Sequence, residues 1–122
     1  MTGATRDVVL RHLDAWRRGD VDGIMQDYAD DAVILVAGAD PVVGKVAIRG
    51  GFEQLFRAVF PTGRTMLTTS DDVFFEEYAW MRWAAASPVA QGRNGTEFLR
   101  VVDGKIVCQT TAVDLVFEAP PA

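Results

Sequence analysis

The apolar residues of this chain recur at helical spacing up to about residue 60 and at strand spacing beyond it. Over residues 5–18, Val9, Leu13 and Trp16 fall on one helical face, which predicts an amphipathic helix. Gly19 is typical of the position that directly follows a helix. The chain is therefore expected to begin with a helix that buries one face.

A second helix, a strand and a third helix are expected next. Asp20 is a natural N-cap, and the apolar residues after it recur at helical spacing until Asp30 and Asp31, which we expect to shape a turn. This apolar stripe consists of Val21, Ile24, Met25 and Tyr28. The apolar run over residues 32–37 is too short for a stable helix and predicts a buried strand. The third helix is predicted over residues 44–59.

Beyond this helix, apolar and polar positions alternate, which predicts a series of strands. These strands are expected over residues 64–69, 73–75, 78–86, 96–102 and 105–117. The segment from Gly92 to Gly95 predicts a turn, and Asp103-Gly104 is a strong signal for a two-residue hairpin. Helices followed by an antiparallel sheet indicate an α+β fold, with the helices packed on one face of the sheet.

Length and composition narrow the class of protein. A chain of 122 residues is expected to form one domain, residues 1–122, with a core that needs no disulfide. The net charge of −5 argues against nucleic acid, and no apolar run approaches the roughly 20 residues of a membrane span. One cysteine, Cys108, and one histidine predict neither a disulfide nor a zinc site, and we expect no cofactor. The N-terminal residues do not resemble a signal peptide, so a cytoplasmic location is expected.

Several motifs carry a family likeness. They are Gly19-Asp20, Tyr28-Ala29-Asp30-Asp31-Ala32, Gly44, and Phe98-Leu99-Arg100-Val101-Val102-Asp103-Gly104-Lys105-Ile106. With these motifs in this order, nearly the whole chain resembles the nuclear transport factor 2-like superfamily. That superfamily includes SnoaL-like polyketide cyclases, ketosteroid isomerases and limonene-epoxide hydrolases. The resemblance implies a cone, in which a strongly curved antiparallel sheet and three N-terminal helices close a pocket, and it implies frequent homodimers.

The resemblance to ketosteroid isomerases suggests two candidate catalytic residues. His12 stands where those enzymes carry an oxyanion-binding tyrosine on the first helix. Glu97 stands where they carry a protonated aspartic acid on the penultimate strand. Their aspartate base corresponds to about Val36, which cannot move a proton. The resemblance therefore implies oxyanion-binding groups without the standard base.

The resemblance to limonene-epoxide hydrolases supplies a third candidate, Arg82, which matches their arginine. Their two carboxylates correspond to Ala84 and about Thr111, so that mechanism is also incomplete. Asp114 matches an aspartate that is common near the end of the last strand, a match that carries no catalytic role.

Strand alternation adds further candidates for the pocket wall. Glu97 and Leu99 share one face of their strand, and the family alignment brings Arg82 to the same side. The expected substrate-binding residues are Trp16, Tyr28, Val36, Trp80, Leu99, Gln109 and Thr111. A few polar groups among aromatic side chains are typical of a small-molecule site.

Each candidate also has a structural interpretation. His12, on an apolar helix face, fits a hydrogen-bonded core histidine, and Glu97 with Arg82 fits an ion pair across adjacent strands. Trp16, Tyr28 and Trp80 fit core packing rather than stacking on a ligand. Cys108 fits inert packing within a strand.

The opposite face of the predicted sheet also carries apolar residues. Those expected there are Met81, Trp83, Phe98, Val102, Ile106, Cys108 and Ala112. Because the helices cover only one face, we expect a homodimer through the other.

Two main functions remain open from the sequence; a third, a protein-interaction domain like nuclear transport factor 2 itself, is less favoured because the sequence has no separate peptide-binding signature. The first is an enzyme of the isomerase or cyclase type that transfers protons on an apolar, carbonyl-bearing substrate. In it, His12 would be the acid or base, Arg82 would polarise an oxygen, and Glu97 would donate a proton or pair with Arg82. The second is a non-catalytic ligand-binding or dimerisation module of the same fold, which the missing acidic residues favour.

Overall fold

A single mixed sheet and three helices make up this computed structural model, which describes residues 2–118. The helices are α1 (Thr2–Arg18), α2 (Val21–Gln26) and α3 (Lys45–Ala58). The strands are β1 (Tyr28–Val36), β2 (Val42–Val43), β3 (Met66–Phe75), β4 (Tyr78–Ala86), β5 (Ala90–Val102) and β6 (Lys105–Phe117). The strand order is β2-β1-β6-β5-β4-β3, and every neighbouring pair is antiparallel except β1 and β6, which run parallel.

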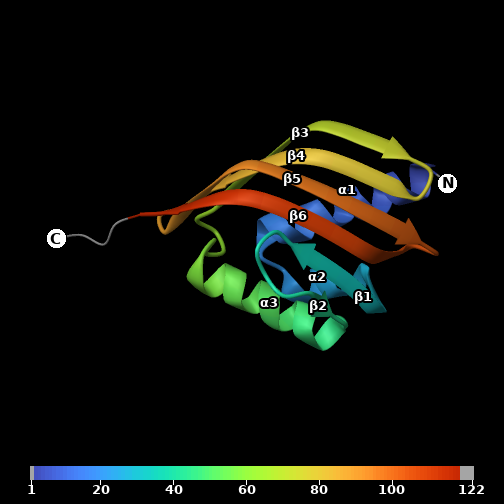
Figure 1. Ribbon diagram of the computed structural model, residues 1–122, viewed down its shortest axis with the longest axis horizontal. Helices are drawn as coiled ribbons and strands as arrows, with labels where there is room; N and C mark the ends of the chain where they lie inside the picture. The colour runs from blue at the N-terminus through green and yellow to red at the C-terminus, as the bar shows by residue number, and fades with distance from the viewer. Residues whose placement is uncertain (1, 119–122) are drawn as a thin grey trace.

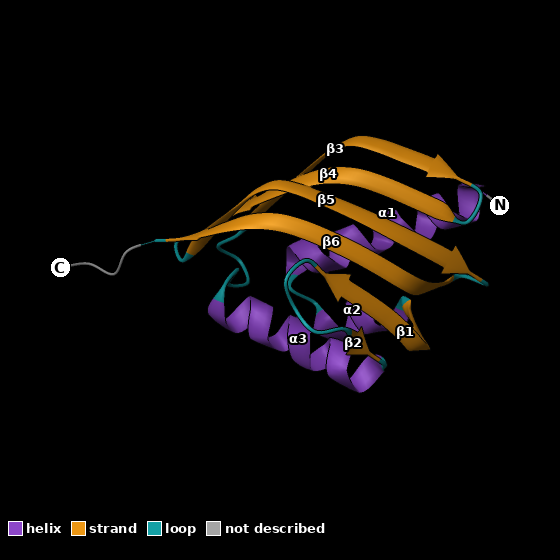
Figure 2. Cartoon of the chain, viewed as in Figure 1, coloured by secondary structure: helices purple, strands orange, loops and turns teal. Residues whose placement is uncertain are grey.

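The sheet is curved, and all three helices lie on its concave side (Figure 1). Strands β3 to β6 arch over the helices, α1 packs beneath β3, β4 and β5, and α3 packs beside β1 and β2 (Figure 2). This arrangement confirms the expected α+β fold with a curved sheet and N-terminal helices. Within residues 2–118, no helix is both long enough and apolar enough to cross a membrane.

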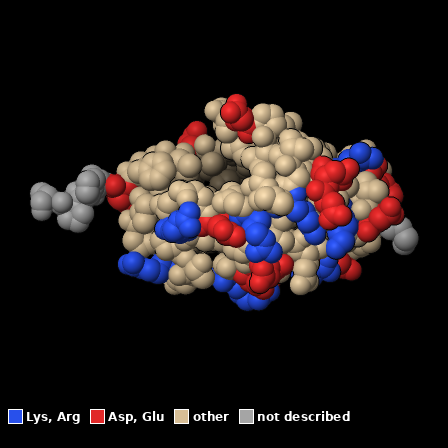
Figure 3. Space-filling model, turned by 90° about the horizontal axis from the view of Figure 1, so that it is seen from below, with Lys and Arg blue, Asp and Glu red and all other residues tan. Residues whose placement is uncertain are grey.

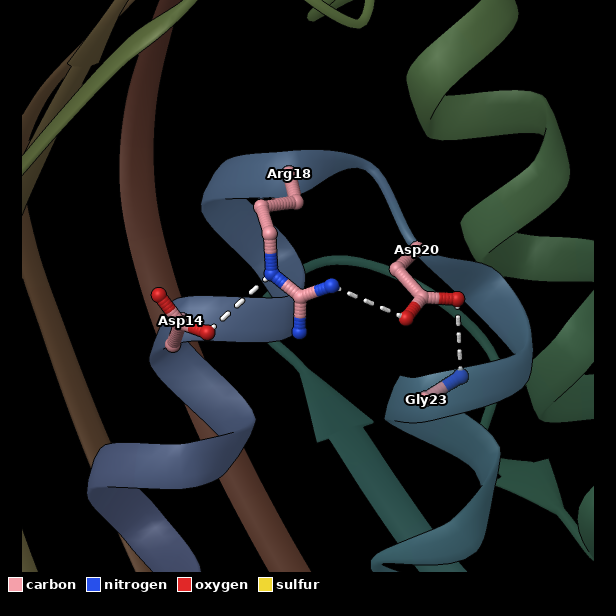
Figure 4. A network of polar contacts seen from close by, with 4 residues as sticks. All are labelled: Asp14, Arg18, Asp20 and Gly23. Atoms are coloured by element: carbon pink, nitrogen blue, oxygen red, sulfur yellow. Dashed lines mark hydrogen bonds and ion pairs between the residues drawn. The ribbon is translucent and has the colours of Figure 1, made fainter.

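The junction between α1 and α2 is built as the sequence predicts. Gly19 has a φ of 62°, which ends α1, and the Asp20 carboxylate accepts a hydrogen bond from the Gly23 amide at 3.0 Å. The Arg18 guanidinium joins the two helices, because it contacts Asp14 at 3.1 Å and Asp20 at 3.3 Å (Figure 4). The same aspartate therefore caps one helix and pairs with the end of the other.

The second helix is shorter than predicted. It ends at Gln26, and Tyr28, expected on a helical stripe, is instead the first residue of β1. Asp30 and Asp31 lie exposed within that strand, so the prediction that they shape a turn is wrong. Regular alternation would place Asp30 on the same face as Tyr28 and Ala32. A register shift between Tyr28 and Val33 interrupts the alternation, so that both aspartates face solvent.

The strands differ from the prediction at two irregular segments. The predicted strands over residues 64–69 and 73–75 are one strand, β3, with a bulge between Ser70 and Val73. The Gly92–Gly95 segment is not a turn but lies inside β5. The Trp83 indole packs flat against this segment: a Cβ on Gly95 would lie 2.6 Å from the Trp83 ring. These glycines allow the Trp83 ring to approach the backbone of β5 closely, and they do not reverse the direction of the chain.

The hairpin at Asp103-Gly104 is confirmed. Both residues have positive φ, 51° and 74°, as a two-residue turn between β5 and β6 requires.

Along β4, the residues that point to the inner face of the sheet are shifted by one position from those predicted. Met81 lies directly opposite Glu97, and directly paired residues share a face, so Met81 and Trp83 point to the helices. Ile106, also expected outside, is fully buried, because a register shift between Arg100 and Val101 interrupts the alternation. A one-residue error in cross-strand alignment thus exchanges the two faces of a strand.

Candidate active site

A cavity of about 260 Å³ lies between the concave face of the sheet and the helices. Its wall is mostly aliphatic and aromatic. The lining residues are His12, Leu13, Trp16, Ile34, Val36, Val42, Ile48, Gly51, Phe52, Leu55, Phe60, Leu67, Trp83, Glu97, Gln109, Thr111, Val113 and Leu115. Figure 3 shows a hollow bordered mainly by uncharged side chains. Apolar walls with a few polar groups are typical of small-molecule sites.

The cavity runs along strand β6 from a buried end to an open one. Alternate residues of this strand line it in the order Gln109, Thr111, Val113 and Leu115. Their exposure rises along the strand, from 5% at Gln109 to 43% at Leu115. Their character changes in the same direction, from amide and hydroxyl to aliphatic. The polar groups of the site therefore lie at its buried end.

Three side chains at the buried end form a hydrogen-bonded chain. The Tyr28 hydroxyl donates to Gln109 Oε1, and Gln109 Nε2 donates to Glu97 Oε1. Each side chain comes from a different strand of the sheet: Tyr28 from β1, Gln109 from β6 and Glu97 from β5. Because these three strands are neighbours, the chain crosses the sheet from one strand to the next.

Burial changes the acidity of both ends of this chain. It raises the pKa of Glu97 from 4.5 to about 7, while the hydrogen bond from Gln109 acts in the opposite direction. Burial also raises the pKa of Tyr28 well above 10, helped by the negative charges of Glu97 and Asp27. Near neutral pH, Glu97 therefore exchanges a proton readily, whereas Tyr28 stays protonated and donates.

His12 lies at the same end of the cavity and is 2% exposed. Its ring meets Tyr28 edge to face at 5.4 Å and Phe52 at 6.2 Å. Burial lowers the pKa of His12 to about 4, so the imidazole is neutral at neutral pH. Its Nδ1 atom has no hydrogen-bond partner among residues 2–118. The neutral imidazole as a whole borders the cavity, and a neutral imidazole can exchange a hydrogen bond with a ligand.

Arg82 and Trp80 lie on the outer face of the sheet, so the prediction that they face the pocket is wrong. The Arg82 side chain is 60% exposed, its Nε lies 3.2 Å from Asp71 Oδ2, and its guanidinium lies 5.3 Å above the Trp80 ring. The expected ion pair between Arg82 and Glu97 does not form. The cause is the register of β4 on β5, which brings Met81 rather than Arg82 opposite Glu97.

The remaining predicted residues divide between the cavity wall and the core behind it. Trp16, Val36 and Thr111 line the cavity. Tyr28 and Leu99 are buried behind the lining residues. Their roles toward a substrate stay predictions.

Sequence reasoning missed Trp83 as part of the cavity wall. Its Nε1 donates to Thr111 Oγ1 at 3.2 Å, which fixes the indole across the inner face of β5. Gly95 directly opposite Trp83 was the available signal, since a large aromatic side chain on a sheet often packs over a glycine on the next strand.

Asp27 was also missed. It is fully buried, and its Oδ1 atom lies 2.7 Å from the Arg11 guanidinium. Its negative charge contributes to the raised pKa of Tyr28, so it favours the protonated hydroxyl that donates to Gln109. Asp27 thus acts on the site from behind the cavity wall.

Comparison with known families identifies the family of this chain. Residues 9–109 match the SnoaL-like domain. The chain belongs to the SnoaL-like domain family. This result confirms the resemblance to the nuclear transport factor 2-like superfamily. No curated protein matches the chain.

Solved structures support the fold of this SnoaL-like protein. A candidate ketosteroid isomerase from Kribbella flavida superposes with a TM-score of 0.78 at 19% identity, covering 99% of this chain and 85% of its own. The epoxide hydrolase/cyclase-like enzyme SalBIII, described in pyran ring formation in salinomycin, gives 0.77 at 17% identity, covering 90% of each chain. AclR, a candidate hydroxylase from Streptomyces galilaeus, gives 0.77 at 20% identity, covering 93% of this chain and 81% of its own. At these identities the likeness is one of fold.

Proposed function

We propose that this SnoaL-like protein transfers protons on an apolar, carbonyl-bearing small molecule, as an isomerase or cyclase does. The observation that carries the proposal is Glu97, whose pKa of about 7 belongs to a carboxyl group in a cavity wall without other ionised side chains. A general acid-base group works best when its pKa lies near the operating pH. The names of structural neighbours, which include ketosteroid isomerase and epoxide hydrolase/cyclase-like enzyme, are consistent with this class.

In the proposed reaction, Glu97 is both base and acid. Its carboxylate removes a proton from the carbon next to the substrate carbonyl, and the electron pair moves onto the carbonyl oxygen to give an enolate. The neutral His12 imidazole donates a hydrogen bond to that oxygen as its charge develops. In a β,γ-unsaturated substrate the enolate is conjugated with the carbon–carbon double bond, so the protonated Glu97 returns the proton to the γ carbon. The carbon–carbon double bond moves into conjugation with the carbonyl, and no net proton is consumed.

The apolar wall supports this proposal, because it keeps water from the enolate and strengthens the hydrogen bond from His12. The lowered pKa of His12 argues that it donates a hydrogen bond rather than serving as the base. Arg82 has no part in the proposed reaction, since it pairs with Asp71 on the outer face.

Proton abstraction from nitrobenzisoxazole tests the base, because its ring opening releases a coloured phenolate. We expect the wild-type protein to accelerate it, with a rate that rises with pH around a midpoint near 7. Replacing Glu97→Gln should reduce the rate by about 10²–10⁴-fold, the range for one acid-base group. The matched control is Glu53→Gln, which changes an exposed carboxylate on α3.

A cyclic β,γ-unsaturated ketone then tests the isomerase step, since its conjugated product absorbs in the ultraviolet. Equal rates for the wild-type protein and Glu97→Gln would remove Glu97 from the mechanism. Binding of the ketone with no acceleration of either reaction would instead favour the non-catalytic, ligand-binding alternative.

We also propose a homodimer through the outer face of the sheet. The structure changes the membership of this face, which carries Tyr78, Trp80, Phe98, Cys108, Thr110 and Ala112. Tyr78 and Phe98 stack there at 6.0 Å. The helices within residues 2–118 lie on the other side of the sheet (Figure 2). Light scattering of the wild-type protein should give twice the mass of one chain, whereas the Phe98→Glu variant should give the mass of one chain. A wild-type monomer at micromolar concentration would contradict the dimer. A cytoplasmic location stays a prediction of the sequence alone.

A further inference from the structure

Both the oxygen and the nitrogen of the Gln109 amide are hydrogen-bonded to other side chains of the protein. Its Oε1 accepts from the Tyr28 hydroxyl, and its Nε2 donates to Glu97 Oε1. The side chain is buried at the closed end of the cavity. The sequence predicts that Gln109 binds the substrate, but its contacts are those of a residue that acts on Glu97.

Tyr28 determines which way the amide of Gln109 points. The pKa of Tyr28 is raised well above 10, so its hydroxyl keeps its proton and needs an acceptor. Oε1 of Gln109 is that acceptor. If the amide were reversed, its NH₂ group would face the Tyr28 hydroxyl and its oxygen would face the Glu97 carboxyl. The hydrogen bond from Tyr28 would then be lost and the amide oxygen would repel an ionised Glu97, so both effects favour the NH₂ group directed at Glu97.

The consequence for Glu97 is that its two oxygens become different. Oε1 accepts the hydrogen bond from Gln109, which makes it the poorer site for a proton. No residue within 2–118 hydrogen-bonds the second oxygen, Oε2. The proton of the neutral acid therefore belongs on Oε2, which is also the oxygen that remains to meet a substrate.

The other groups around Glu97 leave Gln109 as the one that favours its ionised form. Helix α1 contributes the neutral His12, β1 contributes the protonated Tyr28, and Met81 on β4 and Thr111 on β6 lie directly opposite. None of these side chains carries a positive charge at neutral pH. The hydrogen bond from Gln109 is the influence that lowers the pKa of Glu97, against the larger effect of burial.

We propose that Gln109 is a positioning residue, oriented by Tyr28, which holds Oε1 of Glu97 as an acceptor and so makes Oε2 the oxygen that transfers the proton. The inference rests on the proposed function for its catalytic meaning, while the state of the Glu97 carboxyl can be measured without turnover. Gln109 also makes the ionised base available at neutral pH.

The test compares the titration of Glu97 in four proteins by carbon-13 NMR of glutamate carboxyl groups, with Glu97→Gln used to assign the resonance. In the wild-type protein the midpoint is expected near 7. Gln109→Met keeps an unbranched side chain without the donor, and should move the midpoint upward by about one unit or more, as loss of a hydrogen bond to a charged group implies. Tyr28→Phe should move it upward by less, because the amide is kept but is free to reverse.

The control is Gln54→Met, which removes an exposed glutamine on α3 and should leave the midpoint unchanged. The pH profile for nitrobenzisoxazole should shift by the same amount as the NMR midpoint in each variant. Midpoints within 0.2 units of wild type in both Gln109→Met and Tyr28→Phe, with native melting temperatures, would overturn the inference. Absence of acceleration by the wild-type protein would overturn the proposed function instead, so the two failures are distinct.

Discussion

The two faces of strands β4, β5 and β6 treat charge in opposite ways. On the outer face, Arg82 lies 3.2 Å from Asp71 and Arg100 lies 2.8 Å from Glu77, and these side chains are substantially exposed. On the inner face, the ionisable carboxyl is Glu97, and its contact is the neutral amide of Gln109. Strand β5 thus carries a solvated ion pair, at Arg100, on one face and a proton-exchanging acid, Glu97, on the other.

Solvent exposure, rather than residue type, decides what a charged side chain does on these strands. An exposed ion pair is screened by water and contributes between about 0 and 1 kcal/mol. A carboxyl group beside a cavity loses hydration and has no cation to replace it, so its pKa rises. Burial on the inner face therefore gives Glu97 a pKa near neutral pH.

The largest expected difference between exposed and buried positions concerns stability. Leu99→Ala removes a leucine that is 0% exposed and should lower the free energy of unfolding by about 2–5 kcal/mol. The matched change Leu35→Ala, at a β1 leucine that is 45% exposed, should cost less than about 1 kcal/mol. Urea unfolding measures both, and equal losses would mean that the two positions are not packed as described.

A second prediction uses the two buried ionisable groups of the site, whose effects on stability oppose each other. The folded pKa of Glu97 is raised from 4.5 to about 7, so folding is favoured at low pH and this contribution is lost as pH rises to 7. The folded pKa of His12 is lowered from 6.5 to about 4, so stability rises as pH increases from 4 to 6.5. Each effect amounts to at most about 3.5 kcal/mol.

Between pH 4.5 and 6.5 the effects of Glu97 and His12 on the free energy of unfolding change with pH in opposite directions. They should therefore largely cancel in the wild-type protein. In the Glu97→Gln variant the free energy of unfolding should rise with pH across this range. In the His12→Gln variant it should fall. Urea unfolding at a series of pH values measures both slopes. The double variant is the control, since it should again be nearly flat, and slopes of the same sign in the two single variants would contradict the assigned pKa shifts.

The smallest expected effect belongs to the outer face. Arg82→Ala should change the free energy of unfolding by less than about 1 kcal/mol, because its ion pair with Asp71 is exposed. Turnover of nitrobenzisoxazole should equal that of the wild-type protein. A hundredfold loss of rate in this variant would restore Arg82 to the site and contradict the register of β4 on β5.

Much of the fold follows from the sequence because its signals are local. Asp20 and Gly19 mark a helix junction through their own backbone and side-chain chemistry, and Asp103-Gly104 marks a hairpin in the same way. Strands β4 and β6 both have the predicted ends. The family motifs then indicate the curved sheet, which periodicity alone does not.

The site was less predictable because it depends on cross-strand register. Glu97 and Arg82 lie on separate strands, and a shift of one residue between the strands decides whether they meet. Bulges change that register without a strong sequence signal, as in the glycine segment of β5. The acidity of Glu97 depends in turn on the cavity, which exists only after every strand has been placed.

The parallel pairing of β1 with β6 also governs when the site can form in time. Tyr28 and Gln109 are 81 residues apart in the chain, and the hydrogen bond between them needs both strands in place. During synthesis, the helices and β1 leave the ribosome before β6, which follows every other strand described within residues 2–118. Until then the apolar wall has no closing strand, and contacts of such long sequence separation form slowly. A nascent chain that stops before residue 105 should thus present its future cavity wall to chaperones rather than to a ligand.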